Sequence, residues 1–267
     1  MNGNRQSIRR ALSIGTADSS GLGGVSGDAR VFAALGVYPM TVVTAVAARN
    51  TRELAAVAEV PEEVVIAQID AVLEDIGADA IKIGALWSSA IAGNIADRLE
   101  AWGNDRVVVA PMLATMSEAG RLTAEYLSTL RNDLFPHAFL LVLDWQELSL
   151  ASGEAIATAQ EALLACQRLQ ADAGCRILLS GAESDMSRDV FISGEDVEEF
   201  PAATPPDIHR DDVATVLSGA LTGLLATGLD ARAAVRQAMH MRDDTLTRAL
   251  PIGDGVLAPL HTTALHD

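Results

Sequence analysis

The chain has 267 residues, of which 49% are hydrophobic and only 4% aromatic, so alanine, valine, leucine and isoleucine must fill its core. The formal net charge is −17, and Lys82 is the sole lysine. Nucleic acids and anionic membranes bind to basic surfaces, so this charge balance argues against both as partners. The acidity is typical of a salt-adapted surface or of a genome that favours arginine codons, and the composition does not separate these causes.

The two cysteines, Cys166 and Cys175, do not have the spacing of metal ligands. Their small number indicates a reducing compartment. No sustained apolar run follows the basic residues near the start of the sequence, and no run reaches transmembrane length. These features predict a cytoplasmic protein.

Short apolar runs alternate with longer helical patterns along the whole chain. Strands are predicted at residues 10–15, 39–47, 79–84, 106–113, 138–144, 175–181 and 189–194. Helices are predicted at residues 28–35, 61–76, 90–102, 124–134 and 153–173, and two more begin near residues 212 and 230. The polar, proline-rich segment 193–207 is interpreted as a surface connection.

This alternation predicts an α/β fold: a mostly parallel central sheet with helices on both faces. No repeat or long linker divides the chain, so residues 1–267 are expected to form a single domain. In such folds the ligand lies beyond the carboxyl ends of the strands. After the first strand comes a glycine-rich segment, "GTADSSGLGGVSGD", which by itself indicates either a loop with positive φ angles or a close backbone approach to a ligand.

Longer segments carry a more specific signal. "SIGTADSSGLGGVSGDARVFAALGVYPMTVVTAVAARNT", "QIDAVLEDIGADAIKIGAL", "LSGALTGLLATGLDARAAVRQA" and "PIGDGVLAPLH" resemble the hydroxymethylpyrimidine and phosphomethylpyrimidine kinases of thiamine biosynthesis. The resemblance implies a ribokinase-like three-layer fold and a homodimer. It also implies transfer of a phosphoryl group from ATP, with Mg²⁺, to a small pyrimidine substrate.

On the substrate side, the resemblance places five residues near the pyrimidine. Asp28 falls on an acidic residue that hydrogen-bonds the ring, although as a helix cap it would also have a structural role. Arg49 replaces a neutral amide that reads the pyrimidine, which favours an anionic partner or an ion pair with an acid such as Asp28. The other three are small or apolar residues expected to line the pocket, with Ala85 replacing a methionine: Ala17, Val46 and Ala85.

On the nucleotide side, the family motifs are altered. The family sequence "DPVM" becomes "APML", which puts Ala110 in the place of an acid near the metal and the phosphates. Glu147 is retained and Asp144 falls on an asparagine of the family, a pair that would still organise water around Mg²⁺. Ser180, followed by Gly181, replaces a lysine beside the nucleotide. None of the histidines has the spacing of a metal site, so no protein-held metal is predicted.

The catalytic motif departs furthest from the family. The family sequence "GTGC" or "GTGD" aligns without a gap on Asp212, Val213, Ala214 and Thr215. In the family, glycine N–H groups face the transferred phosphoryl group at a helix start, and the last residue accepts the proton of the attacking hydroxyl. Thr215 is a poor base, and Asp212 is expected to cap the helix and repel a phosphate. A shifted base, Asp211 or Asp212, would rescue the reaction.

Three functions therefore stay open from the sequence. The first is an ATP-dependent hydroxymethylpyrimidine kinase. The second is a kinase of the same fold with a different substrate, for example an anionic one. The third is a pseudokinase that keeps the small-molecule pocket and has lost phosphoryl transfer.

Overall fold

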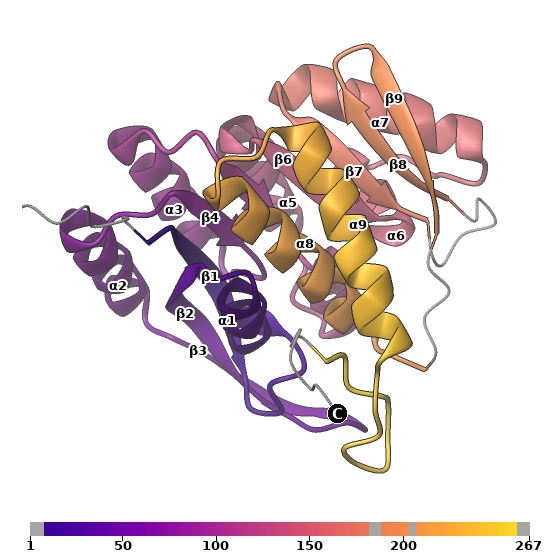
Figure 1. Ribbon diagram of the computed structural model, residues 1–267. Coiled ribbons are helices and arrows are strands. Elements are labelled where there is room, and N and C mark those ends of the chain that lie inside the picture. Colours follow the sequence, from indigo (N-terminus) through magenta and orange to yellow (C-terminus); the bar gives the residue numbers. More distant parts are fainter. Residues whose placement is uncertain (1–7, 182–187, 203–206, 261–267) are drawn as a thin grey trace, which may run out of the picture.

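The computed structural model describes residues 8–181, 188–202 and 207–260, and the strands in this part form one nine-stranded sheet. The strand order is β3-β2-β1-β4-β5-β6-β7-β8-β9 (Figure 1). The strands are β1 (Arg10–Asp18), β2 (Tyr38–Arg49), β3 (Leu54–Glu59), β4 (Ala80–Ile83), β5 (Val107–Val109), β6 (Leu140–Asp144), β7 (Arg176–Ser180), β8 (Arg188–Ser193) and β9 (Asp196–Pro201). The six central strands β2, β1, β4, β5, β6 and β7 are parallel, whereas β3, β8 and β9 pair antiparallel with their neighbours.

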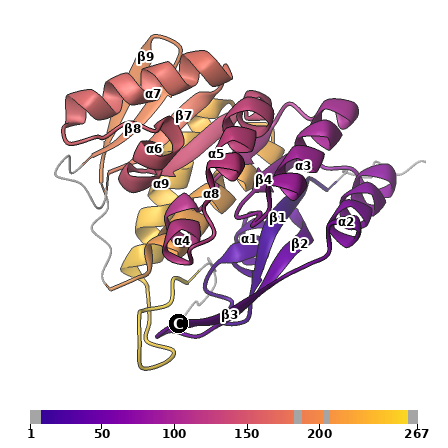
Figure 2. The ribbon, with the colours of Figure 1, turned by 180° about the vertical axis from the view of Figure 1, so that it is seen from behind.

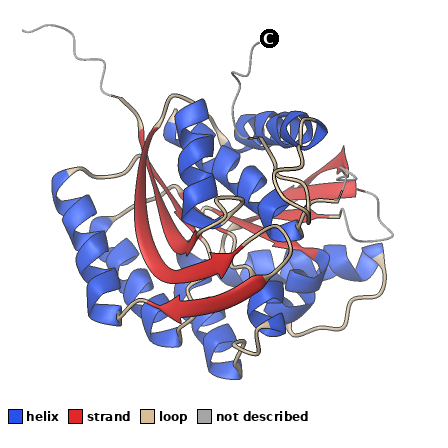
Figure 3. Cartoon of the chain, turned by 90° about the horizontal axis from the view of Figure 1, so that it is seen from below, coloured by secondary structure: helices blue, strands red, loops and turns tan. Residues whose placement is uncertain are grey.

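Helices cover both faces of this sheet, as Figures 2 and 3 show from behind and from below. One face packs against α1 (Gly24–Ala34), α8 (Arg210–Ala226) and α9 (Ala231–Thr247). The other packs against α2 (Glu62–Asp75), α3 (Ser89–Trp102), α4 (Leu113–Glu118), α5 (Ala124–Thr129), α6 (Trp145–Ser152) and α7 (Ala159–Ala173). The predicted three-layer α/β fold is confirmed.

The alternation of side chains along the strands produces the two cores. In β5, Val107 and Val109 join the core under α2–α7, whereas Val108 joins the core under α1, α8 and α9. Every second residue of a strand points to the same face, so a strand that is buried on both sides is apolar throughout. In the described part of the chain no helix is long and apolar enough to cross a bilayer.

All seven predicted strands are present, but the edge strands β3 and β9 were not expected. β3, "LAAVAE", is rich in alanine and mostly exposed, and β9, "DVEEFP", lies within the segment interpreted as a surface connection. Both pair on one side only, so neither shows the apolar run of a central strand. The helix expected over residues 153–173 is also shorter, because Gly153 ends α6 with φ 74° and a Thr158–Glu161 capping box starts α7.

A buried ion pair lies between the sheet and α1. The Lys82 ammonium on β4 is 2.5 Å from Asp28 Oδ1 on α1, and Ser13 on β1 donates to Asp28 Oδ2 at 2.6 Å. Both charged side chains are only 2% exposed. Burial raises the pKa of Asp28, and the charge of Lys82 and the hydrogen bonds from Lys82 and Ser13 oppose this shift. The only lysine of the chain is thus committed to orienting α1 on the sheet.

We predict that Lys82→Met lowers the free energy of unfolding by about 3–5 kcal/mol, because it leaves the Asp28 carboxyl buried without its partner. Adding Asp28→Asn should recover most of the loss, since the amide still accepts a hydrogen bond from Ser13. Urea denaturation of wild type, single and double variants measures this. Equal stability of wild type and Lys82→Met would contradict the prediction.

Candidate functional site

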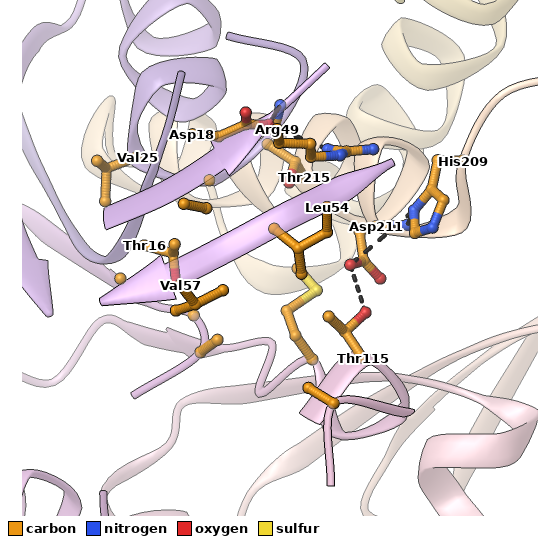
Figure 4. A pocket seen from close by; sticks show the side chains of 18 of the residues that line it. Thr16, Asp18, Val25, Arg49, Leu54, Val57, Thr115, His209, Asp211 and Thr215 are labelled. Atoms are coloured by element: carbon orange, nitrogen blue, oxygen red, sulfur yellow. Dashed lines mark hydrogen bonds and ion pairs between the residues drawn. The ribbon is translucent and has the colours of Figure 1, made fainter. Parts of the chain in front are cut away.

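A cavity of about 750 Å³ opens at the carboxyl ends of β1, β2 and β4. The start of α1, α4 and the first turn of α8 close its other sides (Figure 4). Its lining mixes apolar residues, such as Val25, Val57 and Trp87, with charged ones, such as Asp18 and Arg49. A cavity of this size and composition holds a small organic molecule.

The glycine-rich loop brings its backbone against the start of α8. A Cβ atom at Gly23 would lie 2.8 Å from Asp212 Oδ1 and 3.3 Å from Thr215 Oγ1. The next residue, Gly24, has φ 58°, and a Cβ there would meet the Thr16 carbonyl at 2.2 Å. Glycine is therefore required at both positions. The Asp18 carboxylate fixes the loop by accepting from the backbone N–H groups of Ser20 at 2.8 Å and Gly23 at 3.1 Å.

Arg49, at the end of β2, joins two carboxylates across this loop. Its guanidinium donates to both oxygens of Asp212, at 2.6 and 2.9 Å, and to Asp18 Oδ2 at 3.0 Å. The Asp212 side chain is 0% exposed. Burial raises the pKa of Asp212, and the hydrogen bonds and charge of Arg49 oppose this shift. Arg49 therefore pairs with Asp212 and Asp18, and not with Asp28 as suggested from the sequence.

The first turn of α8 points two neighbouring acids in different directions. Asp212 turns inward to Arg49, whereas Asp211 lines the cavity together with Thr215 (Figure 4). Asp211 accepts a hydrogen bond from Thr115 Oγ1, and His209 Nδ1 lies 3.9 Å from its carboxylate. The expectation that Asp212 caps this helix is wrong, because His209 is the N-cap and accepts from the Asp211 N–H at 3.3 Å.

A smaller cavity of about 50 Å³ lies on the other side of the α8 start, at the carboxyl ends of β5, β6 and β7. It is lined by Ala110, Asp144, Glu147, Ser180 and Arg210, among others. The predicted nucleotide-side residues Asp144, Glu147 and Ser180 thus lie together. Gly181 does not line this cavity, and its N–H donates to the buried Asp189 at 2.8 Å.

The acids of the smaller cavity already have protein partners. Glu147 accepts from the N–H groups of Leu113 at 2.7 Å and Asp144 at 3.1 Å, and Asp144 Oδ1 accepts from the Glu147 N–H. Burial, and secondarily the charges of Asp144 and Asp211, raise the pKa of Glu147 to about 8. Among the residues that the structure describes, no three acidic, histidine or cysteine side chains form a metal-binding group. Both oxygens of Glu147 accept from backbone N–H groups, so of the two acids Asp144 is the one that would contact the water around an Mg²⁺ ion bound with nucleotide phosphates.

The structure corrects two predicted substrate-side residues. Val46 is 52% exposed and Ala17 does not line the cavity, whereas their neighbours Ala47, Thr16 and Asp18 do. Because successive strand residues point to opposite faces, an assignment that is one residue off puts a side chain on the wrong side of the sheet.

The other predicted substrate-side residues do line the cavity. Arg49 and Ala85 are both in its wall. Asp28 also borders it, but both of its oxygens accept from Lys82 and Ser13, so they are already used within the protein.

Sequence reasoning missed two residues of the site. Asp18 had a usable signal, since it is an acid directly at the carboxyl end of a buried strand. Trp87 had none, because an apolar residue in a loop after a strand is ordinary in sequence. Only the structure shows that its indole Nε1 donates to Thr16 Oγ1 at 2.7 Å in the cavity wall.

Known proteins resemble this chain in sequence and in fold. The model of the phosphomethylpyrimidine kinase family matches residues 18–261. This chain belongs to the phosphomethylpyrimidine kinase family. It is 33% identical over 258 residues to a hydroxymethylpyrimidine/phosphomethylpyrimidine kinase of Rhizobium meliloti, covering 94% of this chain and 96% of that one. A protein of the same name from Mycobacterium tuberculosis H37Rv is 34% identical over 252 residues, covering 92% of this chain and 91% of the other.

Solved structures confirm the ribokinase-like fold of this family member. A phosphomethylpyrimidine kinase from Clostridium difficile 630 superposes with a TM-score of 0.75 at 26% identity, covering 86% of this chain and 96% of that one. An ADP complex of Bacillus subtilis pyridoxal kinase gives a TM-score of 0.87 at 25% identity, covering 96% and 98% of the two chains.

We predict that Arg49→Gln destabilises the protein by about 3 kcal/mol at neutral pH, because Asp212 is then buried without a countercharge. Asp212 already has a pKa raised by burial, so its protonation favours the folded state as the pH falls. The deficit should therefore be largest at neutral pH and shrink toward acidic pH. Urea denaturation across this range measures it.

Arg49→Gln/Asp212→Asn is the control, and it should recover most of the stability because it removes the buried charge as well. A deficit that is constant with pH, or one that the double variant retains, would show that Arg49 acts in another way.

Proposed function

We propose that this protein is an ATP-dependent kinase that phosphorylates the hydroxymethyl group of a hydroxymethylpyrimidine, and then its monophosphate. The observation that carries the proposal is the position of the α8 start between the two cavities. The larger cavity accommodates the acceptor, and the smaller one lies beside Asp144 and Ser180, on the expected nucleotide side. Family membership supports the same reaction class.

Asp211 is the proposed general base. Of the three candidates at the helix start, Asp212 is buried and paired with Arg49, and the hydroxyl of Thr215 is not a base near neutral pH. Asp211 lines the larger cavity with its side chain 22% exposed. The hydrogen bond from Thr115 holds its carboxylate in place.

The proposed reaction is an in-line transfer. The hydroxymethyl oxygen attacks the γ-phosphorus of ATP, its proton passes to Asp211, and the bond to the bridging oxygen breaks to release ADP. Mg²⁺ bound with ATP would supply positive charge that offsets the charge of the phosphates. Asp144 would orient water around it. Arg49 acts indirectly, because its pairing with Asp212 fixes the glycine loop and the first turn of α8.

We predict that Asp211→Asn lowers kcat at least ~100-fold, with little change in KM, because it removes the proton acceptor but keeps the shape and the Thr115 contact. Thr215→Ala should reduce kcat only a few-fold. The measurement is steady-state ADP release with Mg–ATP and hydroxymethylpyrimidine.

Two results would contradict this assignment. A full rate for Asp211→Asn would exclude Asp211 as the base. If the wild-type protein released ADP no faster than a sample without protein, the kinase activity itself would be excluded and a small-molecule-binding protein would remain.

A homodimer and a cytoplasmic location complete the proposal. The outer side of the β2–β3 hairpin exposes Val46 (52%) near an edge of the sheet, which supports pairing with a second copy. Cys166 and Cys175 are free and buried, which supports a reducing compartment.

We predict that Val46→Glu converts the dimer into a monomer in sedimentation equilibrium, because it buries a charge in the apolar contact. Val197→Glu, at another exposed position (43%) on the opposite edge strand β9, is the matched control and should leave the dimer intact. A wild-type monomer, or a dimer that survives Val46→Glu, would contradict this interface.

A further inference from the structure

Two residues in the wall of the larger cavity have an unusual backbone conformation. Among the described residues, only Trp87 (φ 65°) and Met112 (φ 54°) are non-glycine residues with positive φ, and both line this cavity. Such a conformation is strained for a side chain of this size, at a cost of roughly 1–3 kcal/mol. Strain that the surrounding structure maintains at a cavity wall points to a role in the site.

The surroundings of Trp87 fix its indole ring. Its Nε1–H donates to Thr16 Oγ1 at 2.7 Å, and Thr44 Oγ1 donates to the carbonyl of Ala85, two residues earlier, at 2.9 Å. Trp87 is only 7% exposed. The loop after β4 is thus held from β1 and β2, and the ring is set before any ligand binds.

The chemistry that Trp87 offers the cavity follows from this hydrogen bond. Its only polar group is satisfied within the protein, so the part of the indole that lines the cavity offers a ligand apolar ring surface. Ala85 lines the same cavity and, with its small side chain, leaves space beside that surface. The guanidinium of Arg49 is held by Asp18 and Asp212, so it is not free to donate hydrogen bonds to polar groups on the edge of a ring.

We propose that Trp87 is a specificity-determining residue, and that its indole stacks against the flat heteroaromatic ring of the acceptor. The proposal rests on the proposed function, because the stacked ring is the one that carries the hydroxymethyl group to be phosphorylated. It adds that ring planarity, more than the pattern of polar groups on the ring edge, selects the acceptor. Stacking is tolerant of ring substituents because every aromatic ring has a π face.

The test is calorimetric binding of hydroxymethylpyrimidine without ATP. Trp87→Leu should weaken binding roughly 10- to 100-fold, the range expected for the loss of one stacked ring, whereas Trp87→Phe should stay within a few-fold. Thr16→Val, which frees the indole from its anchor, should give an intermediate loss.

Trp102→Leu is the matched control, because Trp102 is 41% exposed and does not line the cavity. A ring-saturated analogue should bind weakly and equally to wild type and Trp87→Leu.

A second readout leaves Trp87 in place. The chain has three tryptophans, so Trp102→Phe/Trp145→Phe leaves Trp87 as the only indole fluorophore. Hydroxymethylpyrimidine should quench its emission with the same dissociation constant that calorimetry gives, and the saturated analogue should not.

The outcomes separate this proposal from the proposed function. Affinity that is unchanged in Trp87→Leu, no quenching, or no binding of the pyrimidine to wild type would overturn the role of Trp87. If binding depends on Trp87 but no ADP is released in the presence of Mg–ATP, the proposed kinase activity is wrong and the stacking role of Trp87 is still supported.

Discussion

The bidentate contact between Arg49 and Asp212 is the constraint on which the site depends. It joins the end of β2 to the first turn of α8, two segments that are 163 residues apart in sequence. Asp212 is fully buried beside Gly23, so the glycine loop, β2 and α8 are in contact at one point. A buried carboxylate without this guanidinium would be costly, so this contact stabilises the positions of all three segments.

The contact between Arg49 and Asp212 also determines which acid near the start of α8 can act as the base. Asp212 is fully buried and both of its oxygens accept from Arg49, which leaves Asp211, one residue earlier and in the cavity lining, as the base that a ligand can reach. Asp28 is used in a similar way under α1, where Lys82 donates to one of its oxygens and Ser13 to the other. The divergent catalytic motif is therefore compatible with an active kinase whose base has moved by four residues, about one helical turn, from the position of Thr215 to Asp211.

Much of the fold was predictable from the sequence, because central strands such as Val107–Val109 are buried on both faces and give unbroken apolar runs. The edge strands β3 and β9 were not predictable, because one-sided pairing leaves alanines and acids exposed. At the site, Arg49 lines the cavity, but its partners did not follow from the sequence, since Asp18 and Asp212 meet it only through the loop geometry. Val46 was assigned to the pocket although its neighbour Ala47 is the residue that faces it, because successive strand residues point to opposite faces. Trp87 gave no sequence signal at all.

The most direct test of this account is a crystal structure with a non-hydrolysable ATP analogue and hydroxymethylpyrimidine bound together. The account predicts that the hydroxymethyl oxygen lies within hydrogen-bond distance of the Asp211 carboxylate, about 2.6–3.2 Å, and in line with the terminal phosphorus. It also predicts that Arg49 still contacts both oxygens of Asp212. A hydroxymethyl oxygen placed against Thr215, with Arg49 released from Asp212 and bound to the ligand, would contradict it.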